Sequence, residues 1–344
     1  MKHNNEIIPD GFFLSEENLP KSIINDRPRP LLAYRDTRRA TILVKRTVIG
    51  PFVNRHTTDE DTITIMVRNE SHIRIPNRKL KAVEKNRCLR MARKHDLVDP
   101  QYLTNEVQEI EHLANPVSVL YGDGSNKTNE VAGIPARVIY SQAVSIQPKK
   151  ESIQHITHNA LSDEKTMRNV AEFDKAGKTT MRTSLFETAY VREGTAFLST
   201  ITIDTPTLES LTLVLYGLQA GSYGAGSNVY GTNLRNEVLG IALTKREIPV
   251  TPWSSLHEHE IKNVDDAVKN FVDEIQTKIN EKNGEKFLDS TEVQTLQTNL
   301  LGSMEDVVKA MTTLSKQAKE YVDVVFGSVE NKKSKKTKEK EAEE

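Results

Sequence analysis

Residues 185–243 read LFETAYVREGTAFLSTITIDTPTLESLTLVLYGLQAGSYGAGSNVYGTNLRNEVLGIAL, and the order of patterns in this stretch decides the fold. It opens with two runs rich in β-branched and aromatic residues, 185–191 and 195–203. The short polar turn at 192–194 separates them, so they predict two strands of a hairpin.

The second part of the same stretch predicts a helix, a loop and a strand. Thr205 followed by Pro206 is a favoured start for a helix, which we expect to continue to about Leu218. Residues 219–233 are rich in glycine and predict a loop. Residues 236–243 predict a closing strand.

Strand, strand, helix, glycine-rich loop and strand match the second half of a ferredoxin-like fold. Upstream, residues 40–49 and 62–68 predict strands, and a helical pattern begins at Pro76. Residues 117–121 and 136–146 predict two further strands. The predicted fold class is therefore α+β: a ferredoxin-like, RNA-recognition-type palm, with an antiparallel sheet and helices on one face.

The flanking regions differ from this palm. Residues 147–181 are polar and predict a long excursion from the core, in the form of a hairpin. Residues 262–327 predict helices, and Asp289 with Glu292 forms a capping box from which an apolar stripe continues to Leu314. The Lys/Glu-rich tail, 331–344, predicts disorder.

Composition excludes several classes of protein. The chain has 344 residues and one cysteine, Cys88, so one chain can form neither a disulfide framework nor a four-thiol zinc site. Residues 1–14 lack the features of a signal peptide, and no run of about 18 apolar residues could cross a membrane. We expect a soluble, cytoplasmic protein.

Charge is distributed unevenly along the chain. Residues 27–94 hold 18 Lys and Arg against 6 Asp and Glu, while the whole chain has a net charge of −1. Such asymmetry favours a polyanionic partner, and arginine suits bidentate contact with phosphate. The alternative is a solvated face whose charges are matched by acidic neighbours. The candidate RNA-binding residues in this region are Arg35, Arg38, Arg39, Lys45, Arg46, Arg55, Arg74, Arg78 and Lys79.

The glycine-rich loop is the second candidate RNA-binding feature. Its glycines allow a ligand to approach the backbone closely, and its tyrosines could stack on bases. The alternative is an ordinary connection whose tyrosines pack on the core. The candidate residues are Gly221, Tyr223, Gly224, Ser227, Asn228 and Tyr230.

Motifs of nucleotide-binding and catalytic sites are incomplete. Residues 176–180, AGKTT, resemble the end of a P-loop, but Glu172 occupies the position of the required first glycine. The loop sequence that begins at Gly224 has Val229 where a dinucleotide fingerprint needs its third glycine. We therefore predict no cofactor and no enzymatic activity. A metal-dependent endoribonuclease that uses Asp36 or Asp204 is the alternative.

Four stretches resemble the Csc2 family, the Cas7-like backbone subunits of type I-D CRISPR effector complexes (Cascade). They are YRDTRRATILV at 34–44, VLYGDGSNKT at 119–128, FETAYVREGTAF at 186–197, and GAGSNVYG at 224–231 with NEVLGI at 236–241. The last two are the most specific.

This resemblance implies a hand-shaped subunit that grips guide RNA (crRNA) and stacks with other copies into a helical filament for antiviral defence. It implies target DNA or RNA paired to the guide as a partner. It also implies a large nuclease subunit, a subunit that caps the guide 5′ end, and small subunits. The thumb would contact RNA through Lys178, Thr179, Thr180 and Arg182. The implied regions are an N-terminal arm at 1–30, a palm at 31–250, a basic helical finger at about 69–118, a thumb at about 147–182, a helical region at 251–328 and a disordered tail at 329–344.

One feature departs from the family pattern. Family members often carry a cysteine-rich zinc insertion before the Leu-Tyr-Gly segment, whereas residues 96–118 contain no cysteine. We therefore expect a metal-free insertion there.

Overall fold

The structure is a computed structural model. It describes residues 7–15, 22–55, 62–104, 106–107, 109–127, 130–158, 168–173, 179–181, 186–224 and 229–327. Among the helices described over these ranges, none has the length and apolar content that a membrane span requires.

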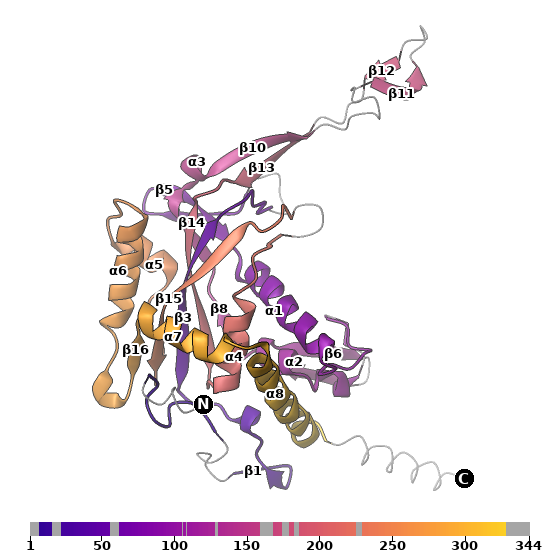
Figure 1. Cartoon of the computed structure of the whole chain (residues 1–344), viewed down its shortest axis with the longest axis vertical. Coiled ribbons are helices and arrows are strands. Elements are labelled where there is room, and N and C mark those ends of the chain that lie inside the picture. Colours follow the sequence, from indigo (N-terminus) through magenta and orange to yellow (C-terminus); the bar gives the residue numbers. More distant parts are fainter. Residues whose placement is uncertain are drawn as a thin grey trace.

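A large antiparallel sheet forms the centre of the molecule (Figure 1). Its strands follow the order β16-β15-β3-β14-β9-β5-β4, and β8 also pairs with β14. The inner four, β15-β3-β14-β9, have the order and antiparallel pairing of a ferredoxin-like sheet. The predicted α+β fold class is therefore confirmed. The strand bounds are β3 Arg39–Val48, β4 Thr64–Val67, β5 Glu70–Ile75, β8 Val138–Tyr140, β9 Ala143–Pro148, β14 Ala196–Asp204, β15 Leu234–Thr244 and β16 Lys286–Leu288.

One face of the sheet is covered by α1 and α4, which take the positions of the two ferredoxin-like helices. The alternating pattern of β3 points Ile42 and Val44 into this core, where they join the buried faces of five helices. These helices are α1 Asn77–Lys94, α2 Pro116–Tyr121, α4 Leu208–Gly217, α7 Ser290–Leu301 and α8 Met304–Val325. Because α1 packs on the sheet, it is part of the palm and not of the finger insertion expected at about 69–118.

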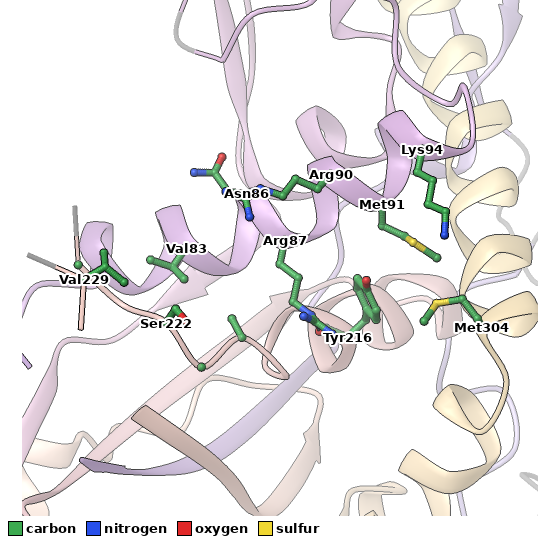
Figure 2. Close-up of a pocket in the computed structure, with 13 residues that line it drawn as sticks. Val83, Asn86, Arg87, Arg90, Met91, Lys94, Tyr216, Ser222, Val229 and Met304 are labelled. Carbon is green, nitrogen blue, oxygen red and sulfur yellow. Dashed lines mark hydrogen bonds between the residues drawn. The ribbon is translucent and has the colours of Figure 1, made fainter. Parts of the chain in front are cut away.

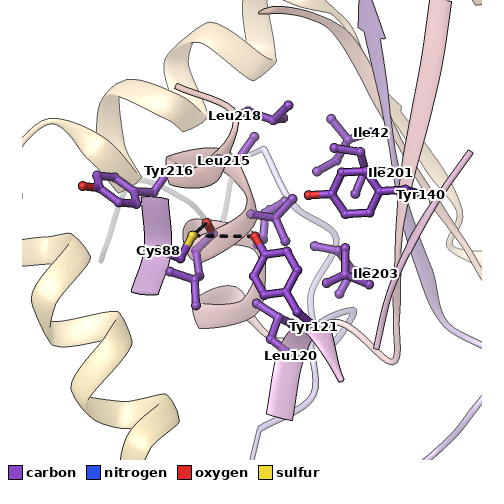
Figure 3. Packing of buried hydrophobic residues seen from close by; sticks show 14 of the residues in the cluster. Ile42, Cys88, Leu120, Tyr121, Tyr140, Ile201, Ile203, Leu215, Tyr216 and Leu218 are labelled. Atoms are coloured by element: carbon purple, nitrogen blue, oxygen red, sulfur yellow. Dashed lines mark hydrogen bonds between the residues drawn. The ribbon is translucent and has the colours of Figure 1, made fainter. Parts of the chain in front are cut away.

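Aromatic hydroxyls enter this core together with aliphatic side chains. Figure 3 shows Tyr121 and Tyr140 among Ile201 and Ile203 of β14. The Cys88 thiol lies 3.6 Å from the Tyr121 hydroxyl, and burial raises the pKa of this thiol to about 12. The single cysteine is therefore a core residue.

The opposite face of the sheet is also covered, which goes beyond the expectation of helices on one face. Leu43 of β3 and Leu198 of β14 pack there with Phe271 and Ile275 of α6. The helices on this side are α5, Pro252–Glu258, and α6, Val264–Gln276 (Figure 1). The central part of the sheet is thus enclosed between two layers of helices.

Two local predictions are wrong. Residues 117–121 form α2 and not a strand, because the Asn115 side chain caps this helix by accepting hydrogen bonds from the backbone of Val117 and Ser118. The cap of α4 is Thr207 and not Thr205. Thr205 has a φ of 52°, whereas Thr207 accepts from Ser210 N in a capping box.

The C-terminal helices agree with the capping box but not with one continuous stripe. Asp289 caps α7 as predicted, with Glu292 bonding back to it. The helix ends at Leu301, and Ser303 caps a separate helix, α8, by accepting a hydrogen bond from Asp306 N.

A two-stranded ribbon projects from one end of the sheet at the position of the predicted thumb (Figure 1). It pairs β10, Ile153–His158, with β13, Phe186–Val191. Within the thumb segment, β11, Arg168–Phe173, pairs with β12, Thr179–Met181. The remaining elements are β1 Ile23–Ile24, β2 Arg27–Pro28, η2 Leu31–Ala33, η3 Ile110–Leu113, β6 Asp123–Lys127, β7 Glu130–Ile134, α3 Lys149–Ser152 and η5 Glu281–Asn283.

Candidate nucleic-acid interface

Two adjoining pockets follow helix α1 and together form what we call the α1 groove. The Arg78 pocket, about 1060 Å³, lies between the first turns of α1 and the segment Phe52–Arg55. The Arg90 pocket, about 800 Å³, lies between the second half of α1, the end of α4 and the glycine-rich loop. Val83, Asn86 and Gly224 line both pockets, so the groove is continuous.

The charge of the α1 groove has one sign. Among the described residues that line it, seven are basic and none is acidic. Walls of one charge raise the local concentration of an oppositely charged ligand. The basic residues are Arg55, Arg74, Arg78, Lys79, Arg87, Arg90 and Lys94.

Helix periodicity explains why α1 presents these side chains. Leu80, Glu84, Cys88 and Ala92 are buried at helical spacing, and the adjacent side of α1 faces the groove. Lys79, Val83, Arg87, Arg90 and Lys94 therefore follow one another along the groove side. The first turn of α1 holds no acidic residue, so the positive end of the helix dipole adds to the charge of Arg78.

Lys79 shows how crowded this positive charge is. Its ammonium donates to Arg55 O at 2.6 Å and to Asn54 Oδ1 at 3.1 Å. Burial lowers the pKa of Lys79, and the neighbouring charge of Arg78 lowers it further. A bound phosphate would relieve both effects, because it would place an opposite charge beside the ammonium.

The glycine-rich loop forms the second wall of the Arg90 pocket. The Asn233 side chain fixes the loop by accepting from Tyr223 N at 2.9 Å and donating to Tyr223 O at 2.7 Å. A Cβ at Gly221 would lie 2.8 Å from Thr232 Cγ2, so a larger residue there would require the Thr232 side chain to move. Gly224 has a φ of 126° and lines both pockets. Tyr230 is half-buried. Ser227 and Asn228 fall outside the described residues.

Arg46 does not line the α1 groove, because its side chain is buried in the core; Tyr223 lines the Arg78 pocket, but its side chain is buried as well, with 2% exposed. Arg46 is 0% exposed and donates to Glu84 Oε1 at 2.7 Å; the Tyr223 hydroxyl donates to the same oxygen at 2.9 Å. Burial favours the uncharged form of Arg46, but the Glu84 charge outweighs it and raises the pKa of Arg46. Burial and Glu84 together also raise the pKa of Tyr223. The alternative that a loop tyrosine packs on the core is correct for Tyr223.

Arg35, Arg38 and Arg39 lie at the opposite end of β3 from Arg55. A ten-residue strand separates the two ends by roughly 30 Å. The three arginines pair with carboxylates there: Arg39 lies 2.5 Å from Asp204, Arg35 lies 3.6 Å from Asp204, and Arg38 Nε donates to Asp36. The candidates between residues 35 and 79 are therefore divided between the two ends of β3. At the Arg35 end, acidic neighbours match the charges.

Lys45 is likewise matched by an acidic neighbour, since its ammonium lies 2.7 Å from Glu237. Asp36 and Asp204 are the two carboxylates considered for metal-dependent RNA cleavage. Asp36 forms an ion pair with Arg38, and Asp204 forms one with Arg39. Over the described ranges of the chain, no group of three or more His, Cys, Asp or Glu could hold a metal ion.

Of the four thumb candidates, two belong to β12. Lys178 and Arg182 fall outside the described residues. Thr179 and Thr180 lie in β12, which fixes their backbone but leaves their side chains undescribed.

Three groove residues, Arg87, Arg90 and Lys94, are absent from the sequence-based candidate set. Their helical spacing was visible in the sequence, but the partner of that helix face was not. Their part in the groove follows from the packing of α1 beside α4 and the glycine-rich loop, which joins residues more than 120 positions apart.

Comparisons with known proteins place the chain in a family. The model of the Csc2 CRISPR family matches residues 65–334. The crystal structure of Thermofilum pendens Csc2 is similar over 85% of this chain and 91% of that chain, with a TM-score of 0.54 and 18% identity, which shows a shared fold. A chain of a CRISPR RNA-guided surveillance complex in a pre-nicking state covers 70% of this chain and 89% of its own length at a TM-score of 0.45 and 10% identity; that likeness is too weak to support an argument. No curated protein sequence matches. Because the family model spans most of its length, this chain belongs to the Csc2 CRISPR family.

Proposed function

We propose that this chain is a guide-RNA-binding backbone subunit of a CRISPR effector complex of type I-D, and that the α1 groove holds the guide. The observation that carries this proposal is the groove itself: seven basic and no acidic side chains among its described lining residues. Membership of the Csc2 family supplies the biological context.

The groove suits the backbone of a single strand. Basic side chains and exposed backbone amides bind phosphates without reading the bases. Such binding fits a subunit that must accept any guide sequence and present it for pairing with target DNA or RNA. We assign no chemical step to the chain.

The ribbon β10–β13 and the segment beyond it remain the proposed thumb. In this proposal Lys178, Thr179, Thr180 and Arg182 contact RNA near the next copy of the subunit in a filament. Ser227, Asn228 and Tyr230 remain proposed RNA contacts of the glycine-rich loop. The large nuclease subunit, the subunit at the guide 5′ end and the small subunits complete the proposed assembly.

A pair of double variants tests the groove. Arg78→Gln with Arg90→Gln removes two charges from the groove, while Arg38→Gln with Arg39→Gln removes two arginines from the other end of β3. We expect the groove variant to lose co-purifying RNA and the control variant to keep it. For the groove variant, the slope of log affinity against log salt should fall by about 0.7 per lost phosphate contact, as for single strands.

Thermal melting of both variants separates binding from folding. Retention of RNA by a folded groove variant, or its loss only in the control, would overturn the assignment of the α1 groove.

A further inference from the structure

The Arg90 pocket combines its charge with an apolar interior. Val83, Met91, Tyr216 and Met304 line it together with the basic side chains. Figure 2 shows Arg87 extending from α1 toward Tyr216, with Met91, Lys94 and Met304 grouped at the same end of the pocket. Phosphate alone does not need an apolar wall, so this pocket suits a ligand with an apolar part as well.

Arg87 is held as a flat surface inside the pocket. Its guanidinium carbon lies 4.6 Å from the centre of the Tyr216 ring. Its Nε donates to Tyr216 O at 3.1 Å, and its Nη2 donates to Gln219 Oε1 at 3.1 Å. A guanidinium plane fixed in this way can stack on another planar group with little loss of side-chain entropy.

Met304 supplies an exposed apolar contact at the same place. It is 52% exposed at the first position of α8, where the Ser303 cap fixes the start of the helix. An exposed methionine is adaptable and packs well against aromatic rings of different shape.

We propose that the Arg90 pocket holds an unpaired nucleobase of the bound RNA. The base stacks on the Arg87 guanidinium and touches Met304, while Arg90 and Lys94 hold the adjoining phosphates. This inference rests on the proposed function and deepens it. The volume of about 800 Å³ is sufficient for one nucleotide, and the shared residues Val83 and Gly224 let the strand continue into the Arg78 pocket.

Two RNAs and two matched variants test the proposal with the full chain. The RNAs are oligoadenylate and an oligoribonucleotide of the same length made of abasic sites, and the measurement is the dissociation constant by fluorescence anisotropy. Arg87→Lys keeps the charge but removes the planar group, whereas Arg90→Lys makes the same change on the rim of the pocket. We expect Arg87→Lys to weaken binding of oligoadenylate about tenfold, as for the loss of one stacked base, and to leave binding of abasic RNA unchanged.

The outcomes are distinguishable. If Arg87→Lys weakens both RNAs equally, or neither, or if Arg90→Lys gives the same difference between the RNAs, the nucleobase site is overturned while the guide-binding function stands. If the unmodified chain binds neither RNA, the proposed function fails and the inference fails with it. Met304→Ser changes an exposed side chain and provides a second test if Arg87→Lys lowers the melting temperature. It should weaken binding of oligoadenylate more than binding of abasic RNA, and an equal effect on both would contradict the site.

Discussion

Glu84 carries a carboxylate inside the core of the palm, with 0% of its surface exposed. Arg46 and Tyr223 donate to its Oε1, and Tyr140 donates to its Oε2 at 2.6 Å. A buried charge is tolerated only when partners replace its water. These partners come from β3, β8 and the glycine-rich loop, so one residue of α1 links this helix to the sheet and to the loop.

Glu84→Gln should therefore be strongly destabilising. The substitution leaves the Arg46 charge buried without a counter-ion, which costs about 3–5 kcal/mol of unfolding free energy. Glu237→Gln is the matched control, because its carboxylate also lies 2.7 Å from a cation, Lys45, but is 53% exposed. The control should cost less than about 1 kcal/mol. Urea denaturation measures both, and equal losses would show that burial does not set the energy of this ion pair.

The raised pKa of Tyr102 predicts that the folded protein loses stability in alkaline solution. Burial raises the pKa of Tyr102 to about 12, and its hydrogen bond to Asp123 contributes to the rise. The unfolded chain deprotonates near its ordinary pKa of about 10, so between pH 10 and 12 only the unfolded state loses this proton. The contribution of Tyr102 is therefore complete below pH 10 and decreases as the pH rises to 12.

The measurement is the free energy of unfolding in urea at pH 9 and at pH 11, for the unmodified chain and for Tyr102→Phe. The loss between the two pH values should be smaller in the variant, because the phenyl ring cannot ionise. An identical loss in both proteins would contradict the role of Tyr102.

At the scale of elements, the helices whose start and spacing depend on neighbouring residues could be predicted from the sequence. The side of each element that is buried depends on residues distant in the chain and could not be predicted. The apolar spacing of α1 and the capping box of α7 are local, and both helices form as expected. A strand places alternate residues on opposite faces, but the sequence does not say which face is enclosed. Lys45 and Arg46 of β3 were for that reason indistinguishable, although Arg46 lies in the core and Lys45 pairs with the exposed Glu237.

The segment at 117–121 illustrates a different limit. Its β-branched residues favour a strand, yet a cap at Asn115 and Pro116 in the first turn start a helix there. Local chemistry outweighs propensity because the cap satisfies backbone donors that would otherwise be buried.

Gly122, which ends α2, should tolerate substitution poorly. It has a φ of 80°, and a Cβ would lie 2.8 Å from the backbone nitrogen of Ala136. Gly194 is the matched control, because it has a φ of 87° and a Cβ added to it would meet no atom within 4 Å. Both substitutions by alanine should cost about 1 kcal/mol or more in backbone strain, and Gly122→Ala should cost measurably more because backbone must move. Thermal melting compares the two, and equal melting temperatures would show that the contact with Ala136 relaxes freely.

At the scale of the whole molecule, the two layers of helices determine where RNA can bind. Helices α5 and α6 cover the face of the sheet opposite α1 and α4, so the centre of the sheet does not offer an open platform for bases. The α1 groove at the margin of the palm offers a concave, positively charged surface instead. The ribbon β10–β13 extends beyond this palm (Figure 1) and is available for contacts outside it.

Removal of the ribbon should separate folding from assembly. Ile153 pairs with Val191 and Gln154 with Tyr190, so the chain can be closed after Gln154 by a two-residue Asn-Gly turn that leads into Tyr190. We expect this shortened chain to keep its melting temperature within a few degrees, because the main sheet does not depend on the residues removed.

If the segment is the thumb that reaches the next copy, the shortened chain should still bind a short RNA but should lose cooperative binding along a long one. Mass photometry with RNAs of increasing length measures this loss, since the unmodified chain should add copies in a concerted manner and the shortened chain one at a time. Unfolding of the shortened chain would contradict the independence of the ribbon, whereas unchanged cooperativity would place the contacts between copies elsewhere on the palm.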